Sequence, residues 1–315
     1  MNKDEYRAEA EQLFEDVESY YRQKLPTSCK DFVSTLRRHA NFFTGIENYS
    51  AAVEKLTEDL DFLEKDSEPF VYERLRIMED IAYVFGEAEN YSEKLSWLER
   101  NLKFCREHFT EDAAESLYAL RQIILLYCYE LADYDKAEQY SRELVDITKR
   151  NCGDSHVDTI EAKQKLADIL HGAEKYDEAR KLREQIVELY RENFSANPRN
   201  KVFNYSCFFD ASIKLARLIF ATADKLDDAT NERLKALDRL NSLLEETIED
   251  YSEETDYALE KISGVRDDIS GDAQASAKLD ELFADYFKND DEDDDDFSDD
   301  EEISFSLGER RGFGN

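Results

Sequence analysis

The chain has 315 residues, of which 41% are apolar and 37% are charged. Its 75 acidic and 41 basic residues give a net charge of −34, which disfavours nucleic acid as a partner because phosphates would be repelled. The longest purely apolar run, near Ile123–Tyr129, is far too short to cross a membrane, so we expect a soluble, cytoplasmic protein.

Apolar residues recur at helical spacing along most of the chain, and only three prolines interrupt it. Asp31 is a candidate cap, and Gly45 and Gly86 are candidate ends of helices. The sequence predicts helices over 4–24, 31–45, 49–65, 70–85, 91–108, 113–131, 134–150, 157–171, 176–194, 203–223, 231–251, 256–269 and 273–287.

A repeat underlies this series of helices. The second helix of each pair begins at a tyrosine, and these marker tyrosines are separated by steps of 43, 42, 43 and 42 residues: Tyr6, Tyr49, Tyr91, Tyr134 and Tyr176. Steps this regular predict an array of stacked helical hairpins. Because the tyrosines repeat with the unit, we expect them to pack rather than to bind a ligand.

The spacing also suggests the domain boundaries. We predict a repeat array over residues 1–195, degenerate repeats with capping helices over 196–287, and a disordered acidic tail over 288–315. The tail holds eleven acidic residues between Asp290 and Glu302, and the remainder of the chain still carries a net charge of −23. Such a block of like charge cannot pack into a core.

Residues at fixed distances from the marker tyrosines resemble the tetratricopeptide repeat. Nine positions earlier lie Ala40, Ala82, Leu125 and Ala167, and three positions later alanine occurs at 52, 137 and 179. The usual unit has about 34 residues. The longer step, with a loop such as CGDSHVDT, is similar to the kinesin light chain type of repeat. The resemblance implies an all-α, right-handed α-solenoid whose concave face is lined by the first helices and binds peptides or proteins.

On the same analogy, candidate groove residues fall eight, twelve or fifteen positions before a marker tyrosine. Amide and guanidinium groups there would hold a peptide backbone or carboxylates through hydrogen bonds. The alternative is a solvated inner face with no ligand. The candidates are Arg37, Asn41, Arg76, Glu79, Tyr83, Gln122, Leu126, Gln164 and Asp168.

Chemistry-bearing motifs are missing. Five cysteines are widely spaced without a CxxC pair, which favours free thiols in a reducing compartment. The four histidines form no HExxH motif and none pairs with a cysteine at metal-ligand spacing. His156 lies in a repeat loop, where a structural role is favoured. We therefore expect no catalytic residues, no metal and no cofactor, and a protein that is not an enzyme.

Two functions remain open. The first is an interaction scaffold that binds a peptide or partner helix in its groove. The alternative is an acidic, chaperone-like binder of basic clients, such as a histone or a ribosomal protein, through its tail. In the tail, Phe297 would present an aromatic ring, and Ser298 precedes a run of acids, beginning with Asp299, Asp300 and Glu301, that suits an acid-directed kinase. The tail would otherwise dock into its own groove or only raise solubility.

Overall fold

The computed structural model describes residues 3–24, 29–65, 70–196, 201–223, 229–250 and 255–287. The chain divides into two compact units, one ending at Asn204 and the other beginning at Tyr205. The predicted tail, including Phe297 and Ser298, lies outside the described residues. Within those residues the secondary structure is helical and contains no strand.

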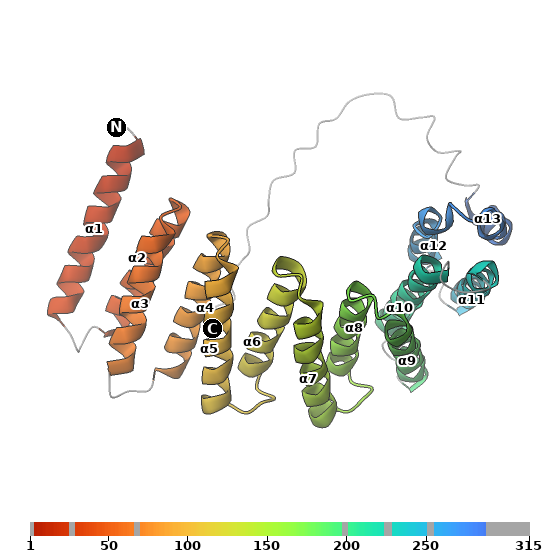
Figure 1. Ribbon diagram of the computed structural model, residues 1–315, viewed down its shortest axis with the longest axis horizontal. Helices are drawn as coiled ribbons and strands as arrows, with labels where there is room; N and C mark the ends of the chain where they lie inside the picture. The colour runs from red at the N-terminus through yellow and green to blue at the C-terminus, as the bar shows by residue number, and fades with distance from the viewer. Residues whose placement is uncertain are drawn as a thin grey trace. The chain divides into compact units, whose positions relative to one another are not determined.

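The first unit is a row of antiparallel helices, each in contact with the next (Figure 1). Four predicted hairpins are present, preceded by a single helix that packs against the first of them. The helices are α1 (Lys3–Gln23), α2 (Cys29–Gly45), α3 (Tyr49–Lys65), α4 (Val71–Glu87), α5 (Tyr91–His108), α6 (Ala114–Leu125), α7 (Tyr134–Cys152), α8 (Val157–Gly172) and α9 (Tyr176–Ala196). The predicted all-α solenoid of helical hairpins is confirmed.

The turn inside each hairpin has a repeated backbone conformation. In each of the four hairpins the residue two positions before the marker tyrosine has a positive φ, between 50° and 62°, although none is a glycine: Glu47, Glu89, Ala132 and Glu174. This left-handed residue ends the first helix, and the following amide bonds back to a carbonyl near that helix end. Asn90 and Asp133 then cap the second helices by accepting from the backbone at Glu93 and Lys136.

One first helix differs from the others. The sequence predicts a continuous helix over 113–131, but α6 ends at Leu125 and a π-helix follows over Leu126–Glu130. A π turn accommodates a single extra residue without ending the helix. This extra residue explains why the step from Tyr91 to Tyr134 is 43 residues, whereas the steps before and after it are 42 residues.

The core of the first unit is apolar and continuous from α2 to α8. Alanines at the hairpin crossings are almost fully buried, and so are Leu56, Ile81 and Ile123. The marker tyrosines Tyr49, Tyr91 and Tyr134 are half-buried and pack against this core. Their predicted packing role is confirmed for these three.

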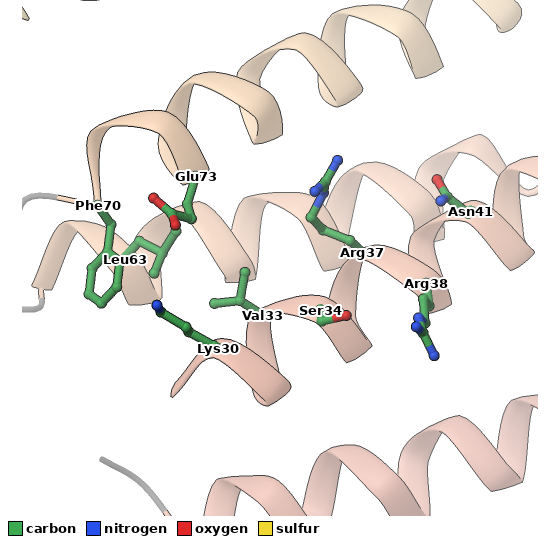
Figure 2. A pocket seen from close by; sticks show the side chains of 9 residues that line it. All are labelled: Lys30, Val33, Ser34, Arg37, Arg38, Asn41, Leu63, Phe70 and Glu73. Atoms are coloured by element: carbon green, nitrogen blue, oxygen red, sulfur yellow. The ribbon is translucent and has the colours of Figure 1, made fainter. Parts of the chain in front are cut away.

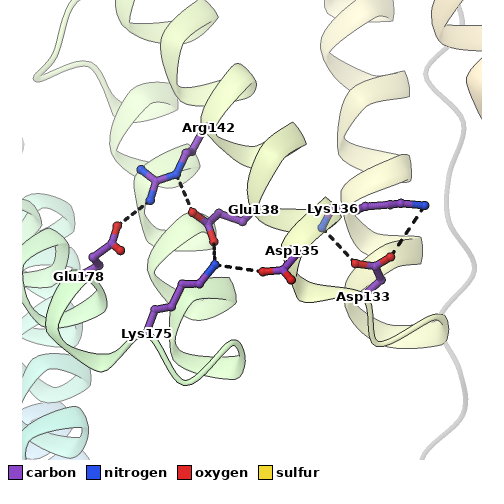
Figure 3. Close-up of polar contacts among 7 residues, drawn as sticks. All are labelled: Asp133, Asp135, Lys136, Glu138, Arg142, Lys175 and Glu178. Atoms are coloured by element: carbon purple, nitrogen blue, oxygen red, sulfur yellow. Dashed lines mark hydrogen bonds and ion pairs between the residues drawn. The ribbon is translucent and has the colours of Figure 1, made fainter.

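Ion pairs join neighbouring hairpins on the surface. Glu138 on α7 accepts from Lys175 at 2.7 Å and from Arg142 at 2.8 Å, and Arg142 also reaches Glu178 on α9 at 2.7 Å (Figure 3). The Glu138 side chain is only 13% exposed. Burial opposes its ionisation, but the hydrogen bonds from Lys175 and Arg142 together outweigh burial and hold the pKa of Glu138 below its ordinary value.

The second unit holds most of α10 (Lys201–Thr222) and all of α11 (Ala229–Asp250), α12 (Thr255–Ser263) and α13 (Ala273–Phe287). The predicted helix over 256–269 is interrupted, because α12 ends at Ser263 and a 3₁₀ turn follows at Asp267–Ile269. Arg233 ties α11 to the start of α13 through Asp272 at 2.9 Å, with both side chains 10% exposed. None of the described helices combines the length and apolar composition that crossing a bilayer requires.

Candidate peptide-binding face

The hairpin turns supply a structural register for the first helices. In each hairpin the amide just before the marker tyrosine donates to one first-helix carbonyl, at 2.8 to 2.9 Å. We call the four acceptors the reference carbonyls: Phe43, Phe85, Tyr127 and Leu170. Three of them lie five residues before their donor. Tyr127 lies six before Asp133, because the π turn inserts one residue between them.

Counting from the reference carbonyls corrects two candidate positions. Leu126, counted onto the groove from Tyr134, is 2% exposed and lies in the core. The structural register replaces Leu126 with the half-buried Leu125. It likewise replaces the half-buried Gln122 with the exposed Arg121. Ile124, which is 1% exposed, then takes the buried crossing position that alanine fills in the other hairpins.

With this register the candidate residues form rows along successive first helices. We call the row two residues before the reference carbonyls the inner row: Asn41, Tyr83, Leu125 and Asp168. Tyr83 is 59% exposed, and Asn41 and Asp168 also reach solvent. A second row, four residues earlier, consists of Arg37, Glu79, Arg121 and Gln164, and exposed Arg76 lies three residues before Glu79.

Two of the candidate residues form ion pairs within the protein. Arg37 on α2 donates to Asp80 on α4 at 2.7 Å, and this bond joins the first helix of the first hairpin to the first helix of the second hairpin. Asp168 accepts from the buried guanidinium of Arg183 on α9 at 2.7 Å. Arg37 and Asp168 therefore help to fix the first helices as well as lining their face.

A cavity of about 380 Å³ lies at the start of this face (Figure 2). It combines three basic side chains, Lys30, Arg37 and Arg38, with Asn41 from the inner row. Lys30 and Arg38 form no ion pair with any other described residue, whereas Glu73 is the acidic side chain of the lining. In a chain with a net charge of −34, this is a local site of the opposite sign. Val33, Leu63 and Phe70 supply its apolar wall.

A second cavity, of about 280 Å³, lies between α6 and α8. Leu125 and Ile124 form an apolar side, and Arg121 and Lys165 bring positive charge beside Glu161. Lys165 also donates to the hydroxyl of Tyr129 at 3.1 Å, and Tyr129 is 69% exposed. Leu125 and Arg121, the residues that the structural register assigns, thus line the same cavity. Leu126 and Gln122, which were counted from the tyrosine, do not line it.

A buried carboxyl group interacts electrostatically with Arg37, which lines the first cavity. Asp59 on α3 is fully buried, and neither of its side-chain oxygens has a hydrogen-bond partner among the described residues. Burial raises the pKa of Asp59 to about 8, against the partial compensation of Arg37. Burial also raises the pKa of Glu79 and of Asp80. Later hairpins have Leu144 and Ile186 at the position of Asp59, ten residues after the marker tyrosine.

The fold and its repeated turns define a helical-repeat solenoid. More narrowly, residues 112–192, which span the last two hairpins of the first unit, match the tetratricopeptide repeat model. The match covers 81 of the 315 residues, so it identifies tetratricopeptide repeats in this part of the chain. No curated protein sequence matches it.

Several solved structures are similar to this chain in fold. A signal transduction ATPase with numerous domains from Pyrococcus horikoshii, which has a tetratricopeptide repeat sensor, aligns with a TM-score of 0.52 at 14% identity. The alignment covers 87% of this chain and 39% of that one. BtubC (BKLC) from P. vanneervenii aligns with a TM-score of 0.49 at 14% identity, over 78% of this chain and 93% of that one. TPR-like repeats of the kinesin light chain type from Podosopora anserina give 0.48 at 15% identity, over 70% and 97%.

Proposed function

We propose that the chain is a non-enzymatic interaction scaffold whose first-helix face binds an extended peptide or a partner helix. The observation that supports this proposal most directly is the basic cavity beside the exposed inner row. Lys30 and Arg38 have charges without ion-pair partners among the described residues, and Asn41 offers both a donor and an acceptor.

The chemistry of this face favours an acidic ligand segment with an apolar side chain. Carboxylates would pair with Lys30 and Arg38, while Val33 and Phe70 would pack against the apolar group. Tyr83, one first helix further along, would contact the next part of the ligand because it is 59% exposed. The ring brings a large contact area at a low cost in side-chain entropy.

A peptide library selected against the full-length protein would test the proposal. Binding of an enriched peptide would then be measured by fluorescence anisotropy for the wild type and for the double variant Asn41→Ala, Tyr83→Ala. We expect the double variant to lose at least about tenfold in affinity with unchanged helicity, which corresponds to a joint contribution of about 1.4 kcal/mol or more from the two side chains.

A matched control changes two exposed residues of the second helix α5, Ser96→Ala and Lys103→Ala. Equal affinity of the wild type and the double variant would reject the first-helix face as the binding site. Removal of residues 288–315 separates this proposal from binding of basic clients by the acidic tail. Loss of all binding after truncation, together with steep salt dependence before it, would favour the tail.

A further inference from the structure

A separate side-chain cluster lies in the loop that joins the last two hairpins of the first unit. The sulfur of Cys152, a ring nitrogen of His156 and a carboxylate oxygen of Asp158 lie within 4.8 Å of one another. From this geometry we propose that the three side chains bind a zinc ion or a closely similar transition-metal ion, at a site distinct from the first-helix face.

The ligand types select the metal. Zn²⁺ accepts thiolate, imidazole and carboxylate ligands in a single tetrahedral site, whereas Ca²⁺ and Mg²⁺ require oxygen ligands throughout. Metal–ligand distances of about 2.0–2.3 Å place tetrahedral ligand atoms closer together than 4.8 Å. Small side-chain rotations bring the three atoms into range. Three protein ligands leave a fourth position for water or for a side chain of a bound partner.

The loop is held in place by contacts that do not use the three ligands. Thr159 on α8 donates to the carbonyl of Gly153 at 2.8 Å, and Lys163 pairs with Asp154 at 2.9 Å. Lys149 on α7 pairs with the same carboxylate at 3.1 Å, so Asp154 is neutralised and is not a ligand. The backbone between Cys152 and His156 is therefore fixed before a metal arrives.

The three ligands are accessible and have few competing partners. Cys152 is a free, exposed thiol at the last position of α7, and the side chains of His156 and Asp158 are 46% and 48% exposed. His156 Nδ1 lies 3.6 Å from Asp158 Oδ2 and accepts a long, 3.3 Å bond from the Asp158 amide. Binding requires loss of the Cys152 thiol proton to solvent, so affinity should rise with pH.

Cobalt provides a direct test on the full-length protein. Co²⁺ would be titrated into protein reduced with a phosphine, and the sulfur-to-cobalt charge-transfer band would be followed in the near ultraviolet. We expect a saturable band that Zn²⁺ abolishes. Cys152→Ser should remove it, and Asp158→Asn should weaken affinity by about tenfold or more, since even second-shell changes cost 10–100-fold. His108→Ala, which changes an exposed histidine elsewhere, should have no effect.

Thermal unfolding gives a readout that does not depend on cobalt. A bound ion links the end of α7 to the start of α8, so Zn²⁺ should raise the unfolding midpoint of the wild type, and a chelator should reverse the rise. Cys152→Ser retains the His156 cap and should unfold normally without responding to Zn²⁺. A cobalt band that is absent from the wild type, or unchanged in Cys152→Ser, would overturn the assignment. An equal Zn²⁺ shift in both proteins would do the same.

Discussion

The ring of Tyr134 lies directly against the backbone of Gly172, the last residue of α8. A Cβ atom at position 172 would be 2.5 Å from Cε1 of Tyr134 and 2.8 Å from its Cζ. The marker tyrosine of one hairpin therefore packs on the end of the next first helix, and the absence of a side chain at 172 is what allows it.

Gly172→Ala is accordingly expected to destabilise the fold by about 1–3 kcal/mol, the usual cost of overpacking. Gly45 ends the equivalent helix of the first hairpin, where no atom lies within 4 Å of an added Cβ. Gly45→Ala should be neutral or stabilise by up to about 1 kcal/mol, because alanine is the better helix former. Chemical denaturation of the two variants measures the difference. Equal effects would mean that the Tyr134 contact does not constrain position 172.

The π turn predicts an unusual tolerance to deletion. Removing the exposed Tyr129 should convert Leu126–Glu130 into regular α-helix and leave helicity and the unfolding midpoint nearly unchanged. The matched deletion is exposed Tyr83 in regular α4. It rotates every residue before it by roughly 100° and takes Met78 out of the core. We expect that variant to lose several kcal/mol. Circular dichroism during heating compares them, and similar losses would refute the single-residue insertion.

Asp59 predicts a pH dependence that a core substitution removes. Its pKa is about 8 in the fold against an ordinary value of 3.8, so the folded state holds a proton that the unfolded state has released. Stability from this group therefore falls as pH rises from about 4 to about 8. Asp59→Leu should stabilise the protein throughout, by on the order of a few kcal/mol more at pH 8 than at pH 4.

The control for Asp59 is Asn101, which occupies the same position one hairpin later and is also buried. Asn101 does not titrate, and its carbonyl oxygen accepts from the thiol of Cys105 at 3.4 Å. Asn101→Leu should change stability equally at pH 4 and pH 8. Parallel pH profiles for wild type and Asp59→Leu would show that Asp59 is ionised in the fold.

Glu138 predicts a pH dependence of stability that is opposite in sign to that of Asp59. Its pKa is held below the ordinary value, so its contribution is present above the unfolded pKa and lost as pH falls through the folded one. Glu138→Gln should cost about 1 kcal/mol at pH 7 and nothing in acid, since Arg142 and Lys175 are partly solvated. Glu178→Gln, which alters the exposed end of the same network, should have a smaller effect. Urea unfolding at pH 7 and pH 3 would show whether the two differ.

The hairpin array could be predicted from the sequence because every unit must meet the same neighbours, which forces the tyrosine step to recur. The extra residue was visible as a step of 43 between Tyr91 and Tyr134. Its location was not, because any point in the step would lengthen it equally. The π turn and the bond from Asp133 to Tyr127 place it, and the assignments of Gln122 and Leu126 moved by one residue as a result.

Other features were missed for a different reason. Acidic residues are so frequent that Asp59 was indistinguishable from a surface carboxylate, although Leu144 and Ile186 at matching positions were an available signal of burial. The cluster of Cys152, His156 and Asp158 depends on how a loop folds back between two helices. Sequence spacing alone does not determine that geometry.

The residues ten positions after successive marker tyrosines also make the two ends of the first unit differ in local stability. Asp59 and Asn101 are polar, whereas Leu144 and Ile186 are apolar, so the free energy of local opening should rise from α3 towards α9. Amide hydrogens of α2 and α3 would then exchange with deuterium sooner than those of α7 and α8. A ligand in the basic cavity at α2 would bind at the end of the array with the lowest local stability. Its binding would slow deuterium exchange there.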